Sequence, residues 1–142
     1  MGWSGNHLHC FKVSEHTYSD EPLEYQDTVD DGTVSLQIVF EQQTRIAYEY
    51  DFGDLWNHDI YLEDVFLTRD QLAVPVCLAG RNACPPENCG GPYGYEDMLA
   101  ALRHPHHEKH DHWMRSTGGG FDPTRFDLVE ANVALQCRAL VH

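Results

Sequence analysis

Alternating apolar and polar positions predict strands in the first half of the chain. Residues 45–52 place Ile46, Tyr48, Tyr50 and Phe52 on one face, and residues 57–67 have the character of a second strand. The Gly53-Asp54 pair between them supplies the turn chemistry of an antiparallel hairpin. Residues 7–13 alternate less regularly and predict another strand, and residues 74–78 form a short third segment.

Two stretches of the first half are harder to interpret. In residues 33–42, Val34, Leu36, Ile38 and Phe40 alternate as in a strand, and residue propensity favours that interpretation. The alternative is a short helix that begins at Leu36, with Ser35 as its N-cap. Residues 14–32 are acidic and poor in periodic apolar positions, so we predict an excursion loop there.

The last third of the chain has the spacing of helices. Apolar residues recur at helical intervals in residues 95–103, and a second helix is predicted over 106–116, before three consecutive glycines. Asp127 and Glu130 resemble a capping box that starts a helix over 128–139. Glycines and prolines exclude regular structure from most of residues 79–94. The pattern predicts one α+β domain, residues 1–142, with a small, mostly antiparallel sheet and C-terminal helices packed on it.

Charge limits the classes of partner. The chain has 9 Lys and Arg against 23 Asp and Glu, a formal net charge of −14, and no cluster of cations. Binding a duplex relies on clustered cations, so duplex nucleic acid is not an expected partner. The acidity suits a cationic partner or a metal ion, or serves solubility alone. No apolar run approaches the roughly 18 residues of a membrane helix, and residues 1–6 lack the features of a secretory signal, so we expect a cytoplasmic protein.

The hairpin concentrates the candidate chemistry. Asp51, Asp54 and His58 lie within eight positions, a spacing at which two carboxylates and an imidazole can interact with one another or bind a divalent cation together. The alternative is structural, because an Asp in a turn commonly bonds its own backbone. The predicted pocket, an acidic-histidine cleft, comprises His7, His9, Tyr50, Asp51, Asp54, Trp56 and His58.

The cysteines offer a second candidate site. The five cysteines are an odd number, and without an export signal they are better interpreted as thiols or metal ligands than as disulfides. Cys77, Cys84 and Cys89, with His58 or one of His7 and His9 as fourth ligand, would hold zinc or another divalent cation. The spacing differs from that of known zinc knuckles, and buried thiols acting as small apolar groups are the alternative.

Several motifs resemble those of the plasmid pRiA4b ORF-3-like family. They are Trp3 with residues 7–9 (HLH), residues 48–58 (YEYDFGDLWNH), 77–80 (CLAG), 83–95 (ACPPENCGGPYGY) and 121–127 (FDPTRFD). The resemblance covers nearly the whole chain in order. It implies a compact α+β domain found on plasmids, mobile elements and bacterial chromosomes, sometimes labelled a resolvase accessory, with no assigned activity.

The resemblance also implies a difference at the N-terminus. Family members have a further strand and helix upstream of the Gly-Trp motif, whereas this chain begins at Met1-Gly2-Trp3. We therefore expect a missing sheet strand, an open edge and self-association through that edge.

Three functions are compatible with these observations. The first is a non-catalytic binding or interaction domain, because few groups stand in a nucleophile–base relation. The second is a metal-dependent hydrolase or nuclease-like enzyme that uses Asp51, Asp54 and His58. The third, a DNA-acting resolvase accessory, is disfavoured by the net charge of −14.

Overall fold

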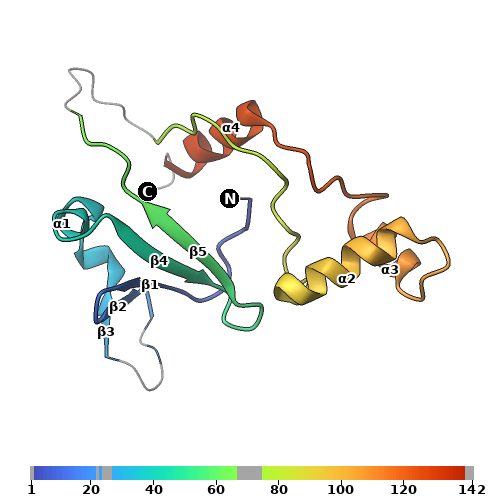
Figure 1. Ribbon diagram of the computed structural model, residues 1–142, viewed down its shortest axis with the longest axis horizontal. Coiled ribbons are helices and arrows are strands. Elements are labelled where there is room, and N and C mark those ends of the chain that lie inside the picture. The colour runs from blue at the N-terminus through green and yellow to red at the C-terminus, as the bar shows by residue number, and fades with distance from the viewer. Residues whose placement is uncertain (1, 22, 24–26, 67–74, 140–142) are drawn as a thin grey trace. The chain divides into compact units, whose positions relative to one another are not determined.

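A five-stranded sheet forms the first half of the protein in the computed structural model, which describes residues 2–21, 23, 27–66 and 75–139 (Figure 1). Its strands are β1 (His9–Val13), β2 (His16–Ser19), β3 (Thr28–Asp30), β4 (Arg45–Tyr50) and β5 (Trp56–Tyr61), in the order β3-β2-β1-β4-β5. All neighbouring pairs are antiparallel except β2 and β3, which are parallel. The predicted α+β class, with a mostly antiparallel sheet followed by helices, is confirmed.

The chain divides into two compact units. The sheet unit comprises Gly5–Phe66 with Gly90–Gly94, and the helical unit comprises Met1–Ser4, Leu67–Cys89 and Tyr95–His142. That all of residues 1–142 act as one domain stays a prediction. Among the described residues, no helix combines the length and the apolar character needed to cross a membrane.

The β4–β5 hairpin follows the sequence pattern closely. Ile46, Tyr48 and Tyr50 alternate on one face of β4, and they pair with Ile60, His58 and Trp56 of β5. The strand β5 ends at Tyr61, earlier than the predicted residue 67. Residue 67 itself, like residue 74 of the predicted third segment, lies outside the described residues. The described remainder of that segment, residues 75–78, forms no strand.

The predicted excursion loop over residues 14–32 is wrong. It contains β2, β3 and the start of the short 3₁₀ helix η1 (Asp31–Thr33). The two strands have four and three residues and carry many polar side chains, so they show no apolar periodicity. Their hydrogen bonds come from pairing with β1 and with each other, which is a tertiary effect.

The ambiguous stretch after η1 is a helix, α1 (Leu36–Phe40), as Ser35 indicated. The Ser35 side chain accepts a hydrogen bond from the Ile38 backbone N–H, and this cap stabilises the first turn. Of the helix residues, Val39 is the buried one, and it joins Val13 and Ile46 in the core of the sheet unit. The burial of Val39 favours the helix over the strand that the alternating pattern suggests, since packing outweighs strand propensity.

The helical unit contains α3 (His110–Ser116), α4 (Leu128–Ala139) and most of α2 (Gly91–Arg103). The helix α2 begins four residues before the predicted start, and α3 begins four residues after its predicted start. Asp127 caps α4 by accepting hydrogen bonds from the backbone N–H groups of Val129 and Glu130, as its spacing predicts. Met98 and Ala101 of α2 are fully buried in this unit.

Candidate functional site

The hairpin loop between β4 and β5 is organised by Asp51. This residue has a left-handed backbone (φ +56°) and a side chain that is almost fully buried. Its Oδ1 atom accepts hydrogen bonds from the backbone N–H groups of Gly53 at 3.0 Å and Asp54 at 3.3 Å. Its Oδ2 atom lies 3.5 Å from Nδ1 of His7. Asp51 therefore stabilises the turn, as the structural alternative anticipated.

Asp54, in the same loop, contacts the two glycines at the start of α2, Gly90 just before the helix and Gly91 as its first residue. Its Oδ2 atom accepts a hydrogen bond from the Gly90 backbone N–H at 3.1 Å. Gly91 has a φ of +67°, and a Cβ there would overlap the Asp54 carbonyl oxygen. Only glycine permits both this backbone conformation and this close approach.

One face of the sheet carries a group of aromatic rings, which we call the aromatic face. The register places His9, Phe11, Tyr48 and His58 on it, together with Tyr50 and Trp56. The Tyr48 ring lies 4.8 Å from that of Phe11, 5.8 Å from His9 and 5.5 Å from His58. The rings of His9 and His58 thus both lie beside the Tyr48 ring, and aromatic rings at these separations stabilise one another.

His9 on this face lies beside two carboxylates. Its Nε2 atom is 2.9 Å from Oδ2 of Asp31, and its Nδ1 atom is 3.7 Å from Oδ1 of Asp20. Asp31 comes from η1 and is partly buried. The pairing of β2 with β3 brings Asp20 and Asp31 close to β1 despite their separation in sequence.

Asp31 also lines an open, mainly apolar cavity of about 260 Å³ within the sheet unit. The remaining wall comes from β1, β2, α1 and its approach, β4 and β5; it consists of Phe11, Val13, Tyr18, Val34, Leu36, Val39, Ile46 and Ile60. Burial, with smaller contributions from neighbouring charges, raises the pKa of Tyr48 on the same face. An apolar wall with one carboxylate is the composition of a binding pocket.

The structure brings together some of the predicted pocket residues. His7 contacts both Asp51 and the edge of the Tyr50 ring, and Tyr50 pairs with Trp56 across the hairpin. His9 and His58 flank Tyr48, with Nδ1 of His58 3.3 Å from the Tyr48 carbonyl oxygen.

The residues of the predicted metal sites are not grouped around a common point in the described part of the chain. Across the described residues, no three or more His, Cys, Asp or Glu side chains are arranged to hold a metal ion. This includes the predicted set of Asp51, Asp54 and His58.

The described cysteines of the predicted zinc site are thiols and are not joined in disulfides. Cys77 lies beside α4, where its backbone N–H and carbonyl both bond the Asn132 amide. Cys89 is buried and Cys84 is half-buried, and burial raises the pKa of the Cys84 thiol. This environment matches the alternative of thiols that act as small apolar groups.

Sequence reasoning did not find Asp20, Asp31 or Phe11 as site residues. Asp20 and Asp31 lie in the stretch predicted to be a loop, and Phe11 lies within the predicted strand over residues 7–13. The one available signal was the density of carboxylates in residues 14–32, beside a strand with two histidines. That signal did not specify which acids face His9, because strand pairing decides it.

The fold and this site define a small α+β domain with an acidic, aromatic sheet face. The chain belongs to the plasmid pRiA4b ORF-3-like protein family, whose model matches residues 1–130. The match covers residues 1–130 and does not test whether a strand and a helix of the family are missing upstream of residue 1. Their absence therefore stays a prediction.

Two relatives extend the comparison without assigning an activity. An uncharacterised protein, y4hQ of Sinorhizobium fredii, is 32% identical over 139 residues, which are 95% of this chain and 71% of that protein. The crystal structure of MM3350 from Methanosarcina mazei Go1, a protein of unknown function, superposes with a TM-score of 0.78. It is 31% identical, and the match covers 92% of this chain and 75% of that one.

Proposed function

We propose that the sheet unit is a non-catalytic binding domain for a basic, amphipathic segment of another protein. The observation that carries this proposal is the apolar cavity with the Asp31 carboxylate in its wall. An apolar side chain of the partner would fill the cavity while a neighbouring Lys or Arg pairs with Asp31. By extension from the family's plasmid name, we propose a cytoplasmic protein associated with plasmids or mobile elements.

The charge of this region supports a cationic partner. Residues 5–66 contain 14 Asp and Glu but only two Lys and Arg, so they carry −12 of the chain's −14. Both cations are already paired, Lys12 with Glu49 at 2.8 Å and Arg45 with Asp59 at 2.6 Å. By strand alternation, both lie on the sheet face opposite the aromatic one. The aromatic face thus offers carboxylates to a cation from outside.

The charge arm of the test compares two variants that remove one negative charge each. Asp31→Asn removes the carboxylate beside the cavity, and Glu63→Gln neutralises an exposed residue after β5. The probe is a fluorescein-labelled amphipathic helix of Leu and Lys, followed by anisotropy. We expect Asp31→Asn to weaken binding about tenfold, because one charge-assisted hydrogen bond is lost, and Glu63→Gln to stay within about twofold. Equal weakening in both variants would attribute binding to overall charge and refute the site.

The apolar arm uses two neighbouring residues of α1. Leu36 lines the cavity and is 58% exposed, whereas Ile38 is 53% exposed and lies outside the lining. Leu36→Gln should weaken binding of the same peptide about fivefold, since apolar contact area is lost, and Ile38→Gln should not. Circular dichroism of each variant checks that α1 and the sheet are retained. If Ile38→Gln is as damaging as Leu36→Gln, the cavity is not the binding site.

We further propose self-association through the edge of β5. This strand ends the sheet order, and the residues after it include Val65, which is 74% exposed, and the exposed Phe66. Light scattering after size exclusion should give a dimer or larger species that Val65→Asp weakens. The matched control is Val129→Asp in α4, where the valine is 73% exposed. A monomeric wild-type protein at micromolar concentration would contradict the proposal.

A metal-dependent hydrolase or nuclease-like enzyme is the alternative function. Its support is that Asp51, Asp54 and His58 lie in one hairpin. A zinc site formed by Cys77, Cys84 and Cys89 is a separate proposal. Elemental analysis of protein purified without an affinity tag distinguishes the cases. Manganese or magnesium that is lost in Asp54→Asn would favour the enzyme, and stoichiometric zinc with three protected loop cysteines would favour the zinc site. Metal-free protein that binds the basic peptide would favour the binding domain.

A further inference from the structure

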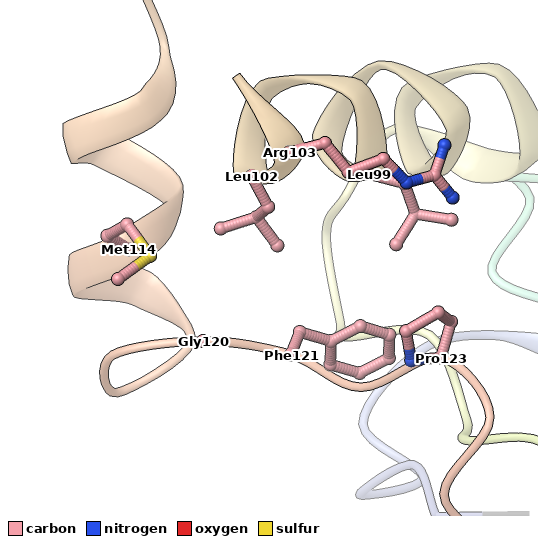
Figure 2. Close-up of a pocket in the computed structure, with 7 residues that line it drawn as sticks. All are labelled: Leu99, Leu102, Arg103, Met114, Gly120, Phe121 and Pro123. Carbon is pink, nitrogen blue, oxygen red and sulfur yellow. The ribbon is translucent and has the colours of Figure 1, made fainter. Parts of the chain in front are cut away.

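A second cavity, of about 240 Å³, lies wholly within the helical unit (Figure 2). Leu99 and Leu102 point from α2 toward Phe121 and Pro123 on the segment after α3, and Met114 of α3 closes one side. The remaining lining residues are Arg103 and Gly120. The cavity is open to solvent and mainly apolar, so a small ligand with an apolar body can enter it.

The segment that carries Phe121 is set by a run of glycines at the end of α3. The Gly119 N–H bonds the Met114 carbonyl at 2.7 Å, and Gly118 has a left-handed φ of +69°. This is the pattern of a helix end that reverses the chain. It returns the backbone beneath α2 in this view and places Phe121 opposite the two leucines (Figure 2).

Arg103 is the charged residue among the seven that line this cavity. In the part of the chain that the structure describes, no carboxylate forms an ion pair with it. Two acids of these helices and the following segment are engaged with other groups. Asp97 pairs with Lys109 at 2.7 Å, and Asp122 accepts hydrogen bonds from the backbone N–H and the hydroxyl of Thr124. The guanidinium is therefore available at an apolar opening.

We propose that this cavity binds a small monocarboxylate with an apolar body, such as an aromatic or branched aliphatic acid. The apolar body would contact the leucines, Met114 and Phe121, and the carboxylate would accept hydrogen bonds from Arg103. Arginine suits this role because its planar fork of donors matches a carboxylate. The site is separate from the sheet unit, so this proposal stands independently of the basic-segment function.

The methionines allow a direct test on the full-length protein. The chain has three methionines, so labelling their methyl groups with ¹³C gives a simple spectrum. Met114 lines the cavity and reports ligand entry, while Met98 is fully buried and reports whether the fold is kept. Phenylacetate is the probe, and phenylacetamide is the neutral control of nearly equal shape.

We expect phenylacetate to shift the Met114 methyl signal with a millimolar dissociation constant and to leave Met98 in place. Phenylacetamide should bind about tenfold more weakly, since it lacks the charge that Arg103 recognises. Arg103→Gln should abolish this preference for the acid, whereas Arg115→Gln, in the last turn of α3 and outside the lining, should keep it.

Three results would overturn the proposal. They are a Met114 signal that phenylacetate does not move, equal affinities for the acid and the amide, and an unchanged preference in Arg103→Gln. A role for Arg103 confined to stabilising the C-terminal end of α2 gives the third result, because the helix dipole needs no ligand.

Discussion

The role of Asp51 can be tested with three substitutions that separate backbone conformation from hydrogen bonding. Its φ of +56° costs an ordinary residue such as Ala about 1 kcal/mol, and costs Gly nothing. Its Oδ1 atom accepts two backbone N–H groups, a pair worth about 1–2 kcal/mol. The contact with His7 at 3.5 Å adds only a few tenths of a kcal/mol, since that histidine is partly exposed.

These contributions predict an order of stability. Asp51→Asn should lose less than about 1 kcal/mol, because an amide oxygen can replace Oδ1 and Asn tolerates a left-handed backbone. Asp51→Gly should lose about 1–2 kcal/mol, since the hydrogen bonds are lost and glycine, like aspartate, adds little or no backbone cost at this φ. Asp51→Ala should lose about 2–3 kcal/mol, because it loses the bonds and adds the backbone cost of about 1 kcal/mol, which Asp largely avoids since it tolerates a left-handed backbone.

The assay must report on the sheet unit alone, because two units can unfold separately. Hydrogen exchange of β4 amides, followed by mass spectrometry across a urea series in EDTA, gives that local free energy of unfolding. Glu63→Ala is the control, and its change should stay within about 0.5 kcal/mol. The reasoning would be refuted if Asp51→Ala were as stable as the wild type, or if Asp51→Gly were less stable than Asp51→Ala. If Asp51 acted only as a metal ligand, none of the three substitutions would change the free energy of unfolding in EDTA.

Three further predictions concern the core, a thiol and an ion pair. Ile46→Ala, at a position 1% exposed, should cost the sheet unit about 2–5 kcal/mol in the same exchange assay, and a smaller loss would mean that the site is not packed. Burial raises the pKa of Cys84, so at about pH 8 in EDTA iodoacetamide should modify it more slowly than the exposed Cys137, as peptide mass spectrometry would show; equal rates would contradict this. The Lys109 hydrogen bond lowers the pKa of Asp97 below its usual 3.8, so the stabilisation is present above pH 3.8 and disappears as the pH falls through the lowered value. The melting temperatures of Asp97→Asn and wild type should therefore differ at neutral pH and converge in acid, and a constant difference would exclude the pair as its cause.

The parts of the fold that sequence predicts well are those whose own residues carry the pattern. The hairpin alternates apolar residues and has turn formers between its strands, and α4 has the Asp127 cap. The strands β2 and β3 carry no such pattern, because they are short and depend on their neighbours. The helix α1 shows the converse, since its alternation suggests a strand and the burial of Val39 decides otherwise.

The candidate site divides in the same way. His9 and His58 could be selected because they lie beside aromatic strand positions, and Asp51 because of its turn. The pairing of His9 with Asp31 could not, since it spans 22 residues and requires a parallel strand pair. The proposed role of Arg103 was equally hidden, because its pocket exists only after α3 and residues 120–123 fold against α2.

The three glycines after α3 have a stereochemical consequence. Their φ angles are +69°, +105° and +153°, and an added Cβ at any of them would meet nothing within 4 Å. The obstacle to a side chain there is handedness rather than crowding. A D-alanine, introduced by joining a synthetic C-terminal peptide to the rest of the chain, would have the φ range that these positions require. Such a mirror-image residue should stiffen the wall of the Arg103 cavity and stabilise the protein, where L-alanine would destabilise it.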